Sequence, residues 1–159
     1  MEDRIEIDWE TYLKAGPPPP ADMHFHGFTW IGPAAMVESW KYLGERTHGT
    51  DMFMSSNVPP EIISCWLYKP RLVQGTWGTA ALAAQWMRAQ WDEFPPEVTH
   101  IDPDNTQQYH QVTLSHGRDT SWAWRSSPGH PTKRWVVVCC CQPNYGSPHI
   151  PCPDPALRR

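Results

Sequence analysis

An unbroken apolar run near the C-terminus is the feature that most constrains the fold. It follows Arg134 and passes through Trp135 and three valines to Cys139, Cys140 and Cys141. A segment that is apolar at every position has no polar face to present to water. Such a segment is typical of a central strand covered on both faces of its sheet. The sequence therefore predicts a sheet with this run at its centre.

The segments around the run predict an α+β layout. Residues 79–94 have the periodicity of an amphipathic helix, with Thr79 as a possible cap. Residues 109–116 and 121–125 alternate with a period of two, which predicts two strands. The other expected elements are a short helix over 5–14, a strand or extended loop over 23–31, a helix after Gly32-Pro33, and a helix or strand over 61–68. We expect one α+β domain, with a three- to four-stranded antiparallel sheet packed against two or three helices.

Prolines predict the boundaries of this domain. Four consecutive prolines at 17–20 favour a stiff polyproline II spacer behind the first helix. Further prolines recur throughout the segment after Gln142. We therefore expect an N-terminal helix with its linker over residues 1–20, the core domain over 21–142, and an irregular proline-rich tail over 143–159.

Composition argues against several classes of protein. The net charge of −4 and the absence of a Lys/Arg run before Arg158-Arg159 argue against nucleic-acid binding, which needs a basic face. The charged N-terminus has no apolar core of a signal peptide, and no apolar stretch is long enough to span a membrane. We therefore expect a cytoplasmic location with reduced cysteines rather than disulfides. The oligomeric state is left open by the sequence.

The cysteines at the end of the apolar run are the first candidate for a metal site. On a strand, Cys139 and Cys141 point to one face, and His149 and Cys152 follow in the tail. Two or more thiolates with an imidazole are ligands that suit zinc. Cys140 with a histidine from elsewhere is another ligand set. The alternative, which we take as the default, is that these cysteines are small core residues and that no cofactor is bound.

A second candidate metal site is the pair His24 and His26. Two histidines one residue apart on a strand share a face, which is a common geometry for metal ligands. A metal site would need one more ligand, for which Asp22, His110 and His116 are candidates, and nothing in the sequence places that ligand. The alternative is a solvated or aromatic-packed histidine pair.

A third candidate is a thiol hydrolase. Cys65 precedes His110 and His116 in the chain, an order found in several cysteine peptidases and amidases in which an imidazole activates the thiolate. The alternative is a core cysteine with two histidines at the edge of the sheet.

A fourth candidate is an aromatic contact surface. Trp122 and Trp124 share a face of the strand over 121–125, and Arg125 and Arg134 flank them. Tryptophan and arginine dominate the energetics of binding interfaces. This contact surface requires that the face be exposed. The alternative is that the helix over 79–94 covers it with Met87 and Trp91.

These patterns favour a small non-enzymatic binding or accessory protein. It would act through a tryptophan-rich surface on a protein partner. The chain has ten tryptophans and no complete catalytic signature. The alternative is a small metal-dependent or cysteine-dependent hydrolase-like enzyme that uses histidine and cysteine residues.

Overall fold

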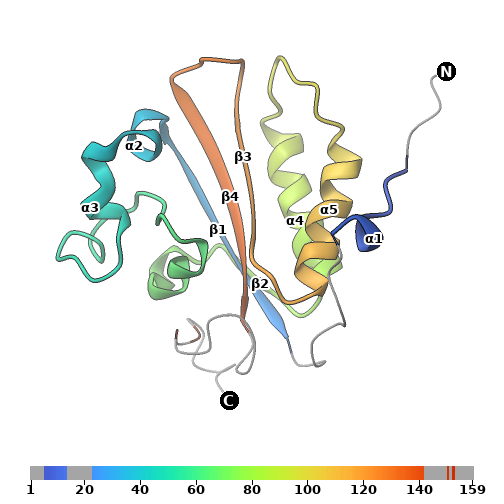
Figure 1. The fold of residues 1–159 in the computed structure, drawn as a ribbon, viewed down its shortest axis with the longest axis horizontal. Coiled ribbons are helices and arrows are strands. Elements are labelled where there is room, and N and C mark those ends of the chain that lie inside the picture. Colours follow the sequence, from blue (N-terminus) through green and yellow to red (C-terminus); the bar gives the residue numbers. More distant parts are fainter. Residues whose placement is uncertain (1–5, 14–22, 142–149, 151, 153–159) are drawn as a thin grey trace.

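The fold is a single four-stranded antiparallel sheet with helices on both faces (Figure 1). The computed structural model describes residues 6–13, 23–141, 150 and 152. Its elements are α1 (Trp9–Leu13), β1 (His24–Pro33), α2 (Ala35–Glu38), η1 (Trp40–Tyr42), α3 (Leu43–Arg46), η2 (Ile63–Tyr68), η3 (Pro70–Leu72), β2 (Gly75–Trp77), α4 (Ala80–Glu93), α5 (Pro103–Ser115), β3 (Thr120–Arg125) and β4 (Thr132–Cys141). The predicted α+β class is confirmed.

Two long strands form the centre of the sheet. The strand order is β2-β1-β4-β3, with every neighbouring pair antiparallel. β1 and β4 are ten residues each and pair along their whole length, from His24 opposite Cys141 to Pro33 opposite Thr132. The apolar run is therefore a central strand, as its composition predicts.

One face of the sheet is covered by α4 and α5, to the right of the sheet in Figure 1. Thr79 caps α4 by accepting a hydrogen bond from the backbone N–H of Leu82. Trp91 of α4 stacks on Trp122 at 4.6 Å between ring centroids, and its ring lies 5.1 Å from that of Trp124. Both tryptophans of β3 are buried in this cluster, so the condition for an exposed aromatic surface at this place is not met.

The other face packs against the 3₁₀ helices between β1 and β2. Phe28 of β1 stacks on Trp66 of η2 at 5.2 Å. Val137 and Cys139 of β4 belong to the same apolar cluster, and so does Ile150 from the C-terminal segment. The sheet is thus covered on both faces, as an all-apolar central strand requires.

The prediction of a strand over residues 109–116 is wrong, because residues 109–115 belong to α5 and His116 is its C-terminal cap residue. Pro103 occupies a favoured first-turn position, and Asp102 caps the helix by accepting from the backbone N–H of Asp104. His110, Thr113 and Leu114 are the buried residues of α5, with the three- and four-residue spacing of a helix face. The apparent alternation of His110 and Leu114 with polar neighbours is also compatible with that helix face.

The helix expected after Gly32-Pro33 is replaced by three short pieces, α2, η1 and α3. Within this segment, Trp40 is 81% exposed. The segment over 61–68 is mostly the 3₁₀ helix η2.

The polyproline spacer predicted at 17–20 lies outside the described residues, as does most of the predicted tail. α1 lies against α5, where the Trp9 indole N–H donates to the Asn105 carbonyl at 3.0 Å.

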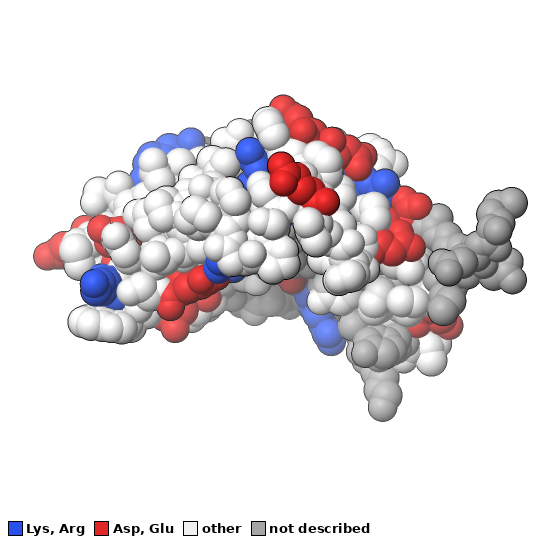
Figure 2. Space-filling view, turned by 90° about the horizontal axis from the view of Figure 1, so that it is seen from above, with Lys and Arg blue, Asp and Glu red and all other residues white. Residues whose placement is uncertain are grey.

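Charged side chains are scattered over the surface. On the face drawn in Figure 2, lysines and arginines occur singly or in small groups among acidic residues and a broad uncharged area. Within the part of the chain that the structure describes, no helix combines the length and apolar character needed to cross a membrane.

A buried tryptophan should contribute more to the free energy of unfolding than an exposed one. We expect Trp122→Ala to lower the free energy of unfolding by about 3–5 kcal/mol, because it leaves a cavity beneath Trp91. Trp40→Ala is the matched control and should change it by less than about 0.5 kcal/mol. Urea titrations followed by circular dichroism measure both, and equal effects would contradict this assignment of core and surface.

Candidate metal centre

The register of β1 and β4 brings two histidines and two cysteines to one end of the sheet. His24 and His26 alternate along β1 and therefore point to the same face. Cys141 lies directly opposite His24, and Cys139 directly opposite His26. Residues directly opposite one another in an antiparallel pair share a face. The two predicted metal sites are thus neighbours on one surface of the sheet.

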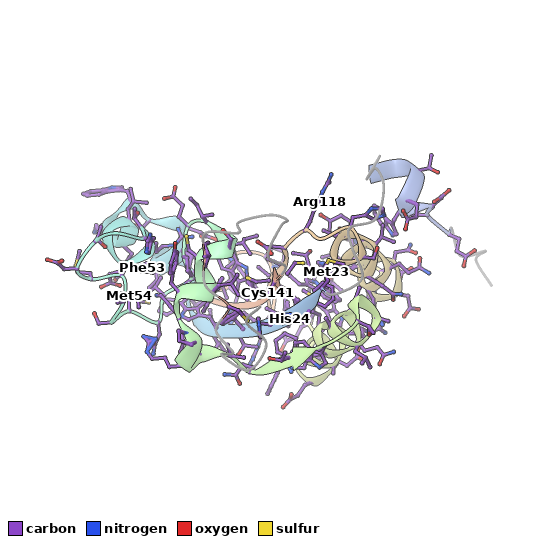
Figure 3. All side chains as sticks on the ribbon, turned by 90° about the horizontal axis from the view of Figure 1, so that it is seen from below. Met23, His24, Phe53, Met54, Arg118 and Cys141 are labelled. Atoms are coloured by element: carbon purple, nitrogen blue, oxygen red, sulfur yellow. The ribbon has the colours of Figure 1, made fainter. Side chains whose placement is uncertain are left out.

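A fourth side chain reaches this place from the C-terminal segment. The Cys152 sulfur lies 3.2 Å from His24 Nε2 and 3.4 Å from His26 Nε2. The ligand atoms of His24, His26, Cys141 and Cys152 all lie within 4.8 Å of one another. Figure 3 shows His24 and Cys141 beside each other at this end of the sheet. This cluster can hold a metal ion.

The spacing suits a tetrahedral ion with little rearrangement. With Zn–N near 2.0 Å and Zn–S near 2.3 Å, two ligands of a tetrahedral zinc lie roughly 3.3–3.8 Å apart. The two nitrogen–sulfur separations of 3.2 and 3.4 Å are close to that range. The widest separation of 4.8 Å requires an inward shift of about an ångström.

The cluster is largely shielded from water. His26 is fully buried, Cys141 and Cys152 are 9% and 7% exposed, and His24 is partly buried. The His24 and His26 rings meet edge to face with centroids 4.8 Å apart. The second ring nitrogen of His26, Nδ1, lies 2.8 Å from the Thr76 hydroxyl on β2. Because water has little access, these buried polar groups depend on one another, or on a bound ion, for partners.

Burial keeps the cysteines of β4 protonated in the absence of a metal ion. It raises the pKa of Cys141 to about 12, and the neighbouring Cys152 sulfur adds to that shift. Burial also raises the pKa of Cys140 to about 12 and that of Cys139 well above its usual value. These thiols are poor nucleophiles at neutral pH. A metal ion would have to displace the proton of Cys141 in order to bind its sulfur.

The structure separates the ligands proposed from sequence into three groups. Cys141, Cys152, His24 and His26 converge, although the sequence assigned them to two different sites. Cys139 points to the same face but donates its S–H to the Ile63 carbonyl at 3.4 Å and lies in the apolar cluster with Phe28. His149 lies outside the described residues.

The structure does not bring Cys65 and His110 together. Cys65 belongs to η2, which packs on the face of β4 that carries Cys139. His110 lies on α5, on the opposite face, where its ring contacts Trp122 at 5.2 Å. Its Nδ1 lies 2.6 Å from the Thr120 hydroxyl. A full β-sheet therefore separates this thiol from this imidazole.

His116 also has a structural setting. It follows the last turn of α5, and its Nε2 lies 2.7 Å from a Glu10 carboxylate oxygen of α1. This contact joins the short N-terminal helix to α5.

The Cys65 thiol is less reactive than an exposed cysteine, because burial raises its pKa.

The residues proposed for an aromatic contact surface have partners within the chain. Trp124 is buried and donates its indole N–H to the Phe94 carbonyl at 2.9 Å. Arg125 pairs with Glu38, and the guanidinium of Arg134 lies 3.9 Å above the Phe94 ring. Trp40, by contrast, is the most exposed large hydrophobic residue within the described part of the chain.

Thr76 is a residue of this site that sequence reasoning missed. It lies on a three-residue strand, which has too few positions for a recognisable alternation. The pattern His24-Phe25-His26 was the available signal. A buried histidine ligand needs a hydrogen-bond partner for its second ring nitrogen, so the pattern predicts such a partner without showing which residue supplies it.

Comparison of the chain with protein-family models, with curated proteins and with solved structures found no match. A role for the chain therefore has to be inferred from the chemistry of His24, His26, Cys141 and Cys152.

The buried imidazole of His110 makes stability depend on pH. Burial lowers its pKa to about 4, whereas an unfolded histidine titrates near 6.5. Between these values only the unfolded chain binds the proton, so the free energy of unfolding falls as the pH falls. From pH 7 to pH 5, we expect the wild type to lose about 2 kcal/mol more than His110→Gln does.

Denaturant titrations at both pH values measure this difference. Asp119 has the opposite sign, because burial raises its pKa to about 6 and protonation then favours the folded state. Wild type and variant share that contribution, so it cancels in the comparison. Parallel pH profiles for the two proteins would show that His110 is not buried in its neutral form.

Proposed function

We propose that this chain is a zinc-binding protein whose metal site is structural, and that it acts as a non-enzymatic binding or accessory protein. The observation that carries the proposal is the convergence of His24, His26, Cys141 and Cys152. Two imidazoles and two thiolates form one of the common ligand sets of structural zinc. Softer or harder ions are less suited to an equal mixture of nitrogen and sulfur.

The number of ligands favours a structural over a catalytic ion. Structural zinc is held by four protein side chains, whereas catalytic zinc has three and keeps one position for water or substrate. All four positions of a tetrahedral ion can be filled here by protein. The low exposure of His26, Cys141 and Cys152 also leaves little room for a substrate.

The ion would join three parts of the chain that are distant in sequence. His24 and His26 come from β1, Cys141 from the end of β4, and Cys152 from the C-terminal segment. Ile150, two residues before Cys152, packs into the apolar cluster of Phe28 and Trp66. Zinc would thus link Cys152 by coordinate bonds to β1 and β4, as a disulfide links distant parts of a chain in an oxidising compartment.

The alternative is a metal-dependent hydrolase-like enzyme at the same site. It would require one of the four ligands, with Cys152 the natural candidate, to give way to a water molecule. X-ray absorption spectroscopy of the zinc-loaded protein separates the two proposals. Two nitrogen and two sulfur ligands support the structural ion, and a bound water with a single sulfur supports the enzyme.

The partner and the location are part of the same proposal. A protein partner is supported by Trp40, whose side chain is 81% exposed and contributes little to the core. The net charge of −4 does not favour nucleic acid. Cys65, Cys139 and Cys140 are free thiols, which suits a reducing compartment such as the cytoplasm.

Metal content tests the ligand set directly. We expect one zinc per chain in wild-type protein, and less than about a tenth of that in Cys141→Ser and Cys152→Ser, because each change removes a thiolate. Cys139→Ala and Cys65→Ala are matched controls and should retain the full zinc content. Elemental analysis after dialysis measures all five proteins. Zinc lost from Cys139→Ala but retained by Cys152→Ser would overturn this ligand set.

Removal of zinc should lower stability. A ligand that binds only the folded state stabilises it by about 2.7 kcal/mol when present at a hundred times its dissociation constant. We therefore expect a chelator to lower the thermal midpoint of the wild type by several degrees and to leave that of Cys152→Ser unchanged. Calorimetry with and without chelator measures both. An equal shift in both proteins would mean that the chelator acts elsewhere.

A further inference from the structure

The contact between His26 and Thr76 extends the candidate metal site to a third strand. His26 Nδ1 lies 2.8 Å from Thr76 Oγ1, while its Nε2 lies 3.4 Å from the Cys152 sulfur. The two ring nitrogens therefore have different roles. One contacts the set of metal ligands and the other contacts β2.

We infer that Thr76 is the positioning residue of the metal site, which holds His26 in the tautomer and ring orientation that present Nε2 to the ion. This inference rests on the proposed metal-binding function. Thr76 does not touch the ion; it acts through His26.

The argument begins with the protonation of a neutral imidazole. Such a ring carries one N–H, and the nitrogen without the proton is the one that binds a metal ion. A hydroxyl oxygen 2.8 Å from Nδ1 can accept the Nδ1–H bond, which leaves the lone pair on Nε2. Because His26 is fully buried, water cannot readily take over the role of Thr76.

The register of β2 places Thr76 for this contact. Thr76 lies directly opposite His26 in the β1–β2 pair, so both side chains point to the same face. The neighbouring Trp77 fixes this register from the other face, where its ring covers Gly27 and Gly75. A Cβ atom would lie 2.7 Å from the Trp77 ring at Gly27 and 2.5 Å from it at Gly75, so the ring packs closely only over glycines.

The chain offers a matched control for this pair. His110 Nδ1 lies 2.6 Å from Thr120 Oγ1 on the other face of the sheet, in a second contact between a buried histidine and a threonine. His110 does not belong to the ligand cluster. Loss of the Thr120 hydroxyl therefore removes the same kind of hydrogen bond without touching the metal site.

The experiment compares Thr76→Val, Thr76→Ser and Thr120→Val with the wild type. Zinc affinity is measured by competition with a chromogenic chelator. We expect Thr76→Val to weaken zinc binding about 10- to 100-fold, since loss of a hydrogen-bond partner to a ligand histidine has effects of that size. Thr76→Ser keeps the hydroxyl and should remain within about threefold of the wild type. Thr120→Val should retain wild-type affinity.

A second readout reports the tautomer directly. Nitrogen-15 shifts of the His26 ring in metal-free protein should show Nδ1 protonated in the wild type and in Thr76→Ser, and a mixture of tautomers in Thr76→Val. Circular dichroism confirms that each variant is folded. This spectroscopic signature would not change if Thr76 merely supported the strand.

The outcomes separate this inference from the proposed function. If the wild type binds no zinc, the proposed function fails, and the inference fails with it. If the wild type binds zinc but Thr76→Val binds it equally well with an unchanged tautomer, only the role of Thr76 is overturned. Equal losses of affinity in Thr76→Val and Thr120→Val would show a general effect of stability and would also overturn it.

Discussion

The pairing of β1 with β4 is the interaction on which the rest of the structure depends. These two strands come from opposite ends of the chain and pair over ten positions. Their register decides which side chains face each layer of the core, since a shift of one residue would reverse every side chain. It also places Cys141 opposite His24. Core packing and the geometry of the site therefore depend on one alignment.

This alignment divides the aromatic residues between two layers. Trp122 and Trp124 pack beneath Trp91 on the helical face, and Phe28 with Trp66 fills the other. The buried tryptophans thus help to cover both faces of the apolar central strand β4. The exposure of Trp40 is an exception that core packing does not explain.

The sequence alone allowed prediction of the elements that carry several signals in agreement. The all-apolar run of β4 is typical of a strand covered on both faces, and α4 combines a capping threonine, an alanine-rich sequence and a length of 14 residues, which together favour a helix. Residues 109–116 were mistaken for a strand because alternate apolar residues also occur on one face of a helix. The cap at Asp102 and the proline after it were the better signal.

The site was predicted only in part, for a reason of geometry. Spacing shows that His24 and His26 share a face and that Cys139 and Cys141 share a face. It does not show that the two strands are neighbours, nor in which register. The choice of Cys141 over Cys139, the approach of Cys152 and the contribution of Thr76 all depend on tertiary contacts.

The position of β4 between two strands also covers a segment whose composition is typical of aggregation-prone sequences. A segment such as Trp135–Cys141 is apolar, uncharged and free of proline, which are the properties of sequences that form amyloid. Val136 to Val138 are paired on both sides, with β1 and with β3. Where β3 has ended, the Asp119 carboxylate accepts the backbone N–H of Cys140 at 2.7 Å. This apolar segment thus offers little open hydrogen-bonding edge to another molecule while β1 and β3 remain in place.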